Sequence, residues 1–194
     1  MLSHLNQYNI ILASQSPRRE ELLRGLNIQF EVKVIDVEES YPIELVGVDI
    51  PMYLAEKKAN AYRNIMNENT LLITADTIVW HEGKVFNKPK DKEDAAAMLR
   101  SLSGKTHQVI TGVCISTLNK RRVFHVLSEV RFARLNPQEI DYYLDNYKPY
   151  DKAGAYGVQE WIGYIGVEFI EGSYFNVMGL PIQRLYNELK RWKV

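Results

Sequence analysis

Residues 14–19, with the sequence S-Q-S-P-R-R, are the first stretch whose residue types and spacing could do chemistry. Ser16 is placed to cap a helix, because the proline after it suits the first helical position. The free backbone N–H groups and the positive dipole end of such a helix can hold an anion. Arg18 and Arg19 lie in the first turn, where the dipole disfavours cations. Either a polyanion such as a phosphate chain binds there, or both arginines are solvated and balanced by the two glutamates that follow.

Asp76 and Thr77 form a second candidate, directly after the apolar run at residues 71–75. Such a run is typical of a buried strand, and polar residues at the end of a buried strand are where α/β proteins usually build their sites. The remaining candidates share positions in loops or near the ends of predicted elements: Glu39, Lys58, Lys88 and the loop at residues 152–159.

Alternating strand and helix patterns predict the elements that must position these residues. Helices are expected at residues 17–24, 51–62, 92–102 and 137–147, and from 181 onward. Strands are expected at residues 9–12, 30–34, 71–80, 85–86, 106–116, 122–135 and 166–170. Between them, Gly154 and Gly157 indicate positive φ or a close backbone approach. The mixture of parallel and antiparallel units predicts an α/β fold around a long, bent mixed sheet in one domain spanning residues 1–194.

Composition narrows the class of protein. Lys plus Arg and Asp plus Glu both number 24, so the overall charge favours neither nucleic acid nor a membrane surface as a partner. The single cysteine, Cys114, lies in an apolar run and is expected to be a buried structural thiol in a reducing compartment. His107, in a strand pattern, is expected to be structural. No run resembles a membrane span or signal peptide, so we expect a cytoplasmic protein.

Six ordered blocks now carry a resemblance that spans almost the whole chain. They are L-A-S-Q-S-P-R-R at 12–19, A-D-T at 75–77, N-K-P at 87–89, L-S-G-K-T-H-Q-V at 102–109, D-K-A-G-A-Y-G-V-Q at 151–159 and G-S-Y-F-N-V-M-G-L-P at 172–181. With these blocks the chain resembles the Maf family of septum-formation-inhibitor-like nucleotide pyrophosphatases. The resemblance implies a fold similar to the inosine-triphosphate pyrophosphatases, with two lobes flanking a cleft, in a homodimer. It also implies hydrolysis of a nucleoside triphosphate to the monophosphate and pyrophosphate with Mg²⁺ or Mn²⁺.

Individual roles follow from the same resemblance. Asp76 matches the proton acceptor of the family, while Arg18, Thr77 and Gln159 match the three positions associated with base choice. Their identities are those of the branch resembling dTTP/UTP pyrophosphatases. The chain departs from the family after the glutamine, where a glycine is common and this sequence has E-W-I at residues 160–162. This departure puts fine specificity in doubt more than chemistry.

The chemistry of the residues is consistent with the hydrolysis of a nucleoside triphosphate that this resemblance implies. A triphosphate needs cations on its oxygens, and the candidate phosphate-binding residues are Ser14, Ser16, Arg19, Lys58 and Lys88. Mg²⁺ binds few protein carboxylates together with waters and substrate oxygens, so Glu39 and Asp76 would suffice as ligands. The neighbouring Lys57 is interpreted as a solvated lysine.

Two alternatives stay open at this point. One is a nucleotide-binding regulator of division or septum formation, in which turnover is incidental. The other is the same chemistry on a purine or 7-methyl-GTP substrate, against which Thr77 and Gln159 argue. The pair Glu39 and Asp76 favours the enzyme, because a binding module gains nothing from a carboxylate that orients water next to a polyanion.

Overall fold

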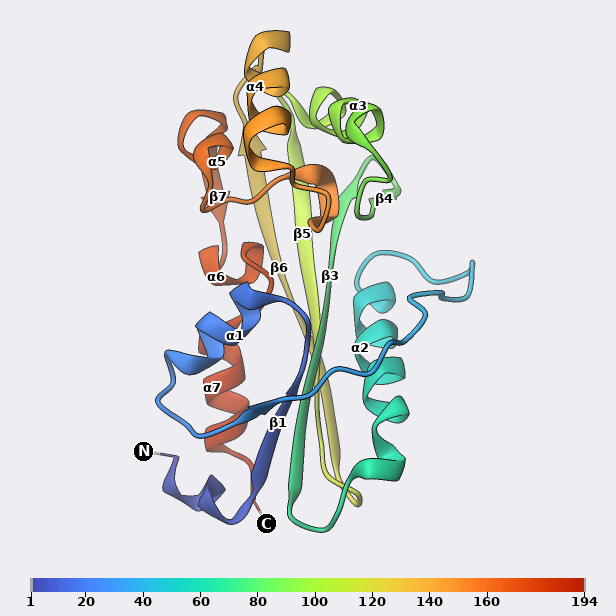
Figure 1. The fold of residues 1–194 in the computed structure, drawn as a ribbon, viewed down its shortest axis with the longest axis vertical. Coiled ribbons are helices and arrows are strands. Elements are labelled where there is room, and N and C mark those ends of the chain that lie inside the picture. Colours follow the sequence, from blue (N-terminus) through green and yellow to red (C-terminus); the bar gives the residue numbers. More distant parts are fainter. Residues whose placement is uncertain (1, 194) are drawn as a thin grey trace. The chain divides into compact units, whose positions relative to one another are not determined.

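A mixed β-sheet organises the chain in the computed structural model, which describes residues 2–193 (Figure 1). Its strands are β1 (Asn9–Ala13), β2 (Glu31–Val32), β3 (Thr70–His81), β4 (Lys84–Phe86), β5 (Thr106–Ser116), β6 (Arg121–Phe132) and β7 (Val167–Glu171). The order is β2-β1-β3-β5-β6-β7, with β4 paired to β3. Strand β1 runs parallel to β2 and β3, whereas β4 is antiparallel to β3 and β7 to β6. The predicted α/β fold with a mixed sheet is therefore confirmed.

The helices connect these strands. The α-helices are α1 (Pro17–Arg24), α2 (Asp49–Ala61), α3 (Lys92–Leu102), α4 (Pro137–Tyr147), α5 (Trp161–Gly166), α6 (Tyr174–Val177) and α7 (Ile182–Lys190). Three short 3₁₀ helices complete the described elements: η1 (Ser3–Gln7), η2 (Arg63–Ile65) and η3 (Ala153–Ala155).

The chain divides into two compact units, and strands β3, β5 and β6 contribute to both. The first unit contains residues 2–76 and 179–193 together with Thr111–Val126. The second unit contains Thr77–Ile110 and Leu127–Met178. The boundary in β3 falls between Asp76 and Thr77. The extent of a single domain over residues 1–194 stays a prediction.

The sheet of the first unit is covered on both faces, which explains why its strands are almost wholly apolar. Alternate residues of β1 and β3, among them Leu12 and Leu71, join one core with the residues of α1 and α7. The intervening residues, among them Ile11 and Leu72, join a second core with the residues of α2. Helices α1 and α7 accordingly lie on one side of β1, and α2 lies on the other (Figure 1).

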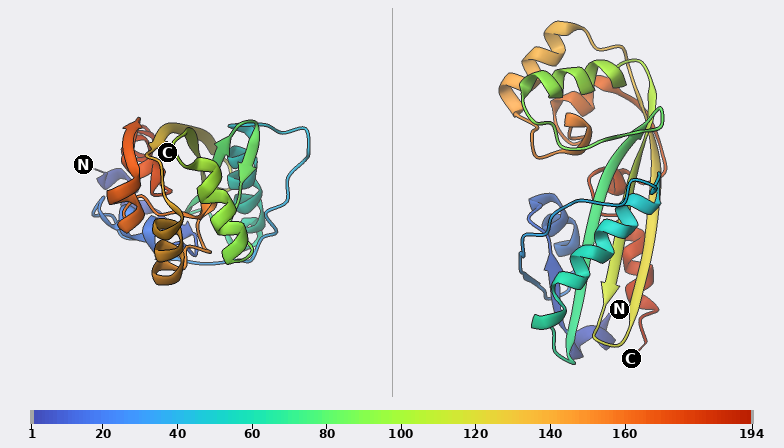
Figure 2. Two further views of the ribbon diagram at one scale, coloured as in Figure 1. Left: turned by 90° about the horizontal axis from the view of Figure 1, so that it is seen from above. Right: turned by 90° about the vertical axis from the view of Figure 1, so that its right-hand side faces the viewer.

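The second unit has one large core. Residues of α3, α4 and α5 and of the loop before α5 pack against β5 and β6, with Phe132 and Tyr143 fully buried at its centre. Helices α3 and α4 lie on the same side of these strands (Figure 2, right). The core therefore fixes the loop at residues 152–160 against a packed layer of helices.

Local sequence signals placed most helix ends correctly. Ser16 caps α1, Asp91 caps α3, and Asn136 forms a capping box with Glu139 at the start of α4. The hairpin between β3 and β4 turns at Glu82 and the following glycine, both with positive φ, as a two-residue connection requires. Strands β5 and β6 are neighbours joined by residues 117–120, and so short a connection makes them antiparallel.

Three boundaries differ clearly from the prediction, and two short α-helices were missed. Strand β2 covers only Glu31–Val32, because its ladder with β1 holds only two residue pairs at the sheet edge. Helix α2 begins at Asp49, with Pro51 inside the first turn, where its missing N–H has no helical partner to lose. Strand β6 ends at Phe132 rather than at 135. Helices α5 and α6 were not predicted.

Candidate functional site

The turn between β1 and α1 is held by the two predicted serines. The backbone N–H of Ser16 donates to Oγ of Ser14 at 3.2 Å, and Oγ of Ser16 accepts from the backbone N–H of Arg19 at 3.5 Å. Arg18 lies partly exposed in the first turn of α1. The predicted helix start is thus confirmed, while anion binding by these serines stays a prediction.

Arg19 ties the start of α1 to the middle of β3, just before Asp76. Its guanidinium donates to the carbonyl oxygens of Ala75 and Gly179, each at 2.8 Å. Burial lowers the pKa of Arg19, and the charge of Asp76 opposes this effect. Arginine remains protonated under such shifts. The side chain therefore fixes the backbone immediately before Asp76, a role that its position in the sequence did not reveal.

Asp76, Glu39 and Lys58 meet at one point. Strand β1 ends at Ala13, opposite Thr74, so β3 continues past its neighbour to Asp76. The ammonium of Lys58 lies 2.6 Å from Oδ1 of Asp76 and 2.7 Å from Oε1 of Glu39. Asp76 is buried, with 6% of its surface exposed, whereas Glu39 lies in an exposed loop. The two predicted metal-ligand carboxylates thus converge on a single cation.

Helix α2 also orders the loop that carries Glu39. The ammonium of Lys57 donates to the carbonyl oxygen and to Oγ of Ser40, each at 2.8 Å. The hydroxyl of Tyr62 accepts from the backbone N–H of Ile35 and donates to the carbonyl oxygen of Lys33. Lys57 is thus partly exposed, as interpreted, and its ammonium in addition anchors this loop. The consecutive lysines Lys58 and Lys57 of α2 thus bind the consecutive loop residues Glu39 and Ser40.

Helix α2 in turn is seated closely on the sheet. A Cβ atom added at Gly112 in β5 would lie 2.2 Å from the carbonyl oxygen of Pro51 and 2.5 Å from the backbone nitrogen of Met52. The hydroxyl of Thr74 donates to the carbonyl oxygen of Ala55 at 2.6 Å in the same interface. The backbone of α2 therefore reaches its position over the sheet only because β5 has no side chain there.

The second unit carries Thr77, Lys88 and Gln159. Thr77 is partly buried in β3, and Lys88 is exposed after β4. Gln159 is partly buried, and its Oε1 atom is buried with no hydrogen-bond partner among the described residues. A buried acceptor without a donor costs about 1–3 kcal/mol, so such an atom indicates a place for a ligand donor. The roles predicted for Thr77 and Lys88 stay predictions.

The loop before Gln159 has the tight backbone that the sequence predicted. Gly154 has φ of 69°, and a Cβ atom there would lie 2.9 Å from Cγ2 of Val79. Ala155 follows with φ of 60°, a conformation that costs a non-glycine residue about 1–2 kcal/mol. At Gly157, a Cβ atom would lie 2.8 Å from the carboxyl carbon of Glu160.

A buried network within this loop was not found from the sequence. The ammonium of Lys152 lies 2.7 Å from Oδ1 of Asp151 and 3.1 Å from Oε1 of Glu160. Oε2 of Glu160 accepts a hydrogen bond from the hydroxyl of Tyr143, which itself accepts from the backbone N–H of Gly157 at 3.0 Å. Burial and the adjacent Glu160 raise the pKa of Tyr143, which keeps its hydroxyl protonated. A lysine within a run of small and apolar residues was the available signal, because buried cations need partners.

Two expected structural residues are confirmed. Cys114 is fully buried, and burial raises the pKa of its thiol to about 11. His107 is 2% exposed, its Nε2 lies 2.7 Å from the hydroxyl of Tyr156, and burial lowers its pKa to about 3.

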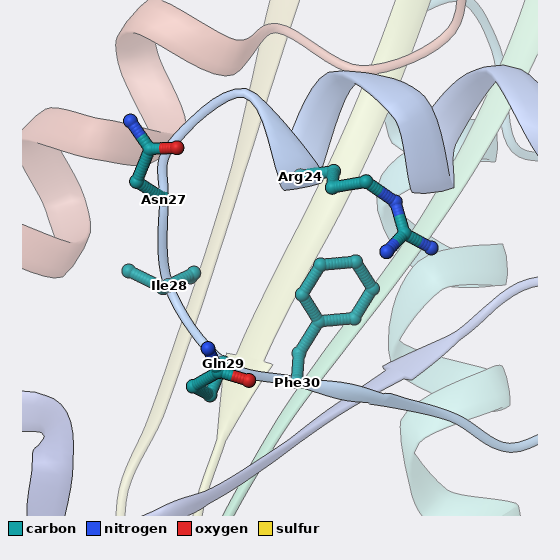
Figure 3. Close-up of a pocket in the computed structure, with 5 residues that line it drawn as sticks. All are labelled: Arg24, Asn27, Ile28, Gln29 and Phe30. Atoms are coloured by element: carbon teal, nitrogen blue, oxygen red, sulfur yellow. The ribbon is translucent and has the colours of Figure 1, made fainter.

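A pocket of about 260 Å³ in the first unit contains none of the predicted site residues (Figure 3). It is lined by Arg24, Asn27, Ile28, Gln29 and Phe30. The guanidinium of Arg24 lies 5.8 Å from the centre of the Phe30 ring and pairs with Glu20. The aromatic face is thus covered by the chain's own cation, and the pocket offers no group for the predicted reaction.

Comparison with known proteins gives the family. The family model described as Maf-like protein matches residues 9–192, nearly the full chain. The chain belongs to the Maf family. A Maf relative from Bacteroides fragilis strain YCH46, named dTTP/UTP pyrophosphatase, is 59% identical over 192 residues, which cover 98% of this chain and all of the relative. A relative of the same name from Phocaeicola vulgatus is 60% identical over 192 residues, with the same coverage.

The fold of this Maf protein is also that of a solved structure. The Ham1 protein of Staphylococcus aureus superimposes with a TM-score of 0.53 over 93% of this chain and 99% of the other, at 16% identity. The predicted resemblance in fold is thus confirmed. No helix among residues 2–193 of the Maf protein is both long and apolar enough to cross a membrane.

Proposed function

We propose that the chain hydrolyses dTTP and UTP to the nucleoside monophosphate and pyrophosphate. The observation that carries this proposal is the convergence of Asp76, Glu39 and Lys58 at the point where β3 passes the end of β1. A buried carboxylate beside a lysine provides a group to orient water and a cation for phosphate oxygens. The name dTTP/UTP pyrophosphatase borne by relatives that match almost the entire chain supports the substrate class. The alternative of a regulator with incidental turnover is not favoured, because these relatives are named for hydrolysis.

In the proposed reaction, water attacks the α-phosphorus of the nucleotide. The water oxygen forms the new bond to phosphorus, while the bond from phosphorus to the α,β-bridging oxygen breaks and its electron pair leaves with pyrophosphate. Asp76 would accept the proton of the attacking water, a role that its buried carboxylate supports. Arg19, Lys58 and Lys88, with the turn of Ser14 and Ser16, would bind the phosphate oxygens.

A divalent cation, Mg²⁺ or Mn²⁺, is part of the proposal. Asp76 and Glu39 fit it, because their oxygens already converge on the ammonium of Lys58. The described residues contain no cluster of three or more metal-ligating side chains, and Mg²⁺ binds through one or two carboxylates together with substrate phosphates. When bound, the metal would neutralise charge on the leaving pyrophosphate. The ammonium of Lys58, beside the two carboxylates, would supply a positive charge for the phosphate oxygens.

Base choice is assigned to Gln159, with Thr77 and Arg18 assisting. The buried Oε1 of Gln159 lacks a donor among the described residues. Uracil and thymine carry a hydrogen on N3, whereas N3 of cytosine is an acceptor. The pyrimidine N3–H of UTP or dTTP would therefore satisfy this oxygen, and cytosine in the same pose would leave it unpaired.

The assay is pyrophosphate release from dTTP, UTP, CTP, dATP, GTP and 7-methyl-GTP, with Mg²⁺ or Mn²⁺ and with EDTA as control. We expect metal-dependent release confined to dTTP and UTP. Release from 7-methyl-GTP or GTP instead would contradict the substrate class. Tight nucleotide binding without release from any member would contradict the enzyme and restore the regulator.

A homodimer in the cytoplasm completes the proposal. The resemblance to the Maf family supports the dimer, and the single buried Cys114 is compatible with a reducing compartment. Sedimentation of the purified protein tests the oligomeric state.

A further inference from the structure

We propose that Glu160 is a positioning residue for base selection, acting with Lys152 and Tyr143 to hold Gln159 in place. This inference rests on the proposed function, because it concerns the same nucleotide site. None of the three residues is proposed to touch the reacting atoms.

The first step of the argument is the connectivity of the network. The carboxylate of Glu160 contacts Lys152, eight positions earlier in the loop, through Oε1 at 3.1 Å. Through Oε2 it accepts from the hydroxyl of Tyr143, which belongs to the packed helix α4. The backbone N–H of Gly157 donates to that same hydroxyl at 3.0 Å. One carboxylate therefore links the beginning of the loop, its end and the helix beneath it.

The second step is burial. Lys152 is 8% exposed and Tyr143 is fully buried, while the side chain of Glu160 is 20% exposed. Removing one partner of a buried ion pair leaves an uncompensated charge, which is strongly unfavourable. Lys152 keeps Asp151 as a second partner, but the side chain of Asp151 is 58% exposed. Glu160 is thus the inner counter-ion of a buried cation.

The third step places Gln159 between two fixed neighbours. On one side, a Cβ atom at Gly163 would lie 1.8 Å from the carbonyl oxygen of Val158, so the chain folds back tightly against that residue. On the other side, the backbone N–H of Glu160 donates to the carbonyl oxygen of Gly157 at 3.0 Å. The backbone of Gln159 is therefore clamped within a compact turn, and Glu160 anchors one end of the clamp.

The fourth step is the consequence for the ligand. The Oε1 atom of Gln159 is buried and lacks a donor among residues 2–193, so it can discriminate between bases only if the loop presents it at a constant position. Position 160, where a glycine is common in the family, is a glutamate in this chain. Its side chain fills the space next to Gly157. The network therefore supplies the rigidity that a glutamine side chain does not possess by itself.

The test compares Glu160→Gln and Tyr143→Phe with Glu168→Gln. Glu168 is a matched control, because it lies in the same unit and pairs with Arg131 at 3.0 Å on the exposed surface. We expect Glu160→Gln and Tyr143→Phe to lower the UTP-to-CTP ratio of kcat/KM about tenfold or more, through a higher KM for UTP. The kcat for UTP should stay within about twofold of wild type, and Glu168→Gln should leave all values unchanged. Glu160→Asp, which retains the charge, should recover part of the ratio.

Several outcomes would overturn the inference. A lower melting temperature with an unchanged UTP-to-CTP ratio would make Glu160 merely structural, as would an equal fall in kcat for every nucleotide. If the wild-type protein releases no pyrophosphate, the proposed function fails separately, and calorimetric binding of UMP and CMP replaces the kinetic assay. The same loss of preference for UMP is then expected in Glu160→Gln, and equal binding of UMP and CMP by the wild type would reject the network's role.

Discussion

Gly112→Ala is expected to damage the site from a distance, by pushing α2 away from the sheet. The added Cβ atom would lie 2.2 Å from the carbonyl oxygen of Pro51, whereas ordinary contacts lie at 3.4–4 Å. All of the nearest atoms belong to the backbone of α2, so no rotamer change can relieve the clash. The helix must therefore move by about 1 Å or the strand must bend, since packed interiors transmit such strain.

The displacement has two measurable consequences. Overpacking of this kind costs about 1–3 kcal/mol of stability, or a fall of about 2–12 °C in melting temperature for a chain of this size. The 2.6 Å contact from Lys58 on α2 to Asp76 on β3 would lengthen by a similar distance. A misplacement of about 1 Å can cost a factor of about 100 in rate.

The assay is pyrophosphate release at a temperature where the variant is folded, with thermal unfolding measured in parallel. Gly83→Ala is the control. Gly83 has φ of +76° but no atom lies within 4 Å of an added Cβ, so this change costs about 1–2 kcal/mol through the backbone alone. We expect both variants to lose stability and only Gly112→Ala to lose turnover. Equal turnover in the two variants would refute the claim that the packing of α2 against β5 determines the position of the Lys58 ammonium.

Three further predictions address single side chains. Asp76→Asn should still bind dTTP but lose turnover by about 100-fold or more, and unchanged turnover would remove Asp76 from the mechanism. Lys57→Ala should raise the Mg²⁺ concentration needed for half-maximal activity, whereas Lys190→Ala, at an exposed position, is the control. The reason is that Ser40 loses its hydrogen bonds to Lys57, and the adjacent Glu39 is then held less firmly. An unchanged Mg²⁺ concentration for half-maximal activity would count against this role of Lys57. Burial holds the pKa of His107 near 3 in the folded protein. As the pH falls from about 6.5, only the unfolded chain therefore takes up a proton on this histidine. The free energy of unfolding should then fall by up to about 1.4 kcal/mol per pH unit, down to about pH 3. His107→Gln should flatten that part of the denaturation profile, and a profile identical to wild type would show that another group controls it.

The sequence predicted those features that local chemistry determines. A serine before proline and an asparagine three residues before glutamate locate helix starts without any distant contact, and Ser16 and Asn136 cap α1 and α4 as expected. The run at residues 71–75 predicted the buried strand that leads to Asp76, and β3 continues past it to His81, close to the predicted end at residue 80. The pairing of Lys58 with two carboxylates was foreseen only as a set of residue types.

Features that depend on how closely the folded backbone approaches itself could not be predicted. Helix α5 forms although Gly163 is a poor helix former, because only glycine allows the turn to close on Val158. The requirement for glycine at position 112 depends on α2, whose residues 49–61 lie far from Gly112 in the sequence. The pairing of Lys152 with Glu160 depends on a loop that folds back over eight residues, and periodicity carries no information about such closure.

The attachment of the Glu39 loop to α2 has a consequence for exchange with solvent. Tyr62, Lys57 and Lys58 hold this loop by their side chains, so it can open locally without melting the helix or the sheet. The backbone amide of Ile35, which donates to the hydroxyl of Tyr62 at 2.7 Å, is the natural reporter of that opening. Its deuterium uptake should be faster than that of β3 and should slow when nucleotide is present. The loop that carries Glu39 would thus open and close as a unit separate from α2 and the sheet. Its closed state would be favoured when substrate binds.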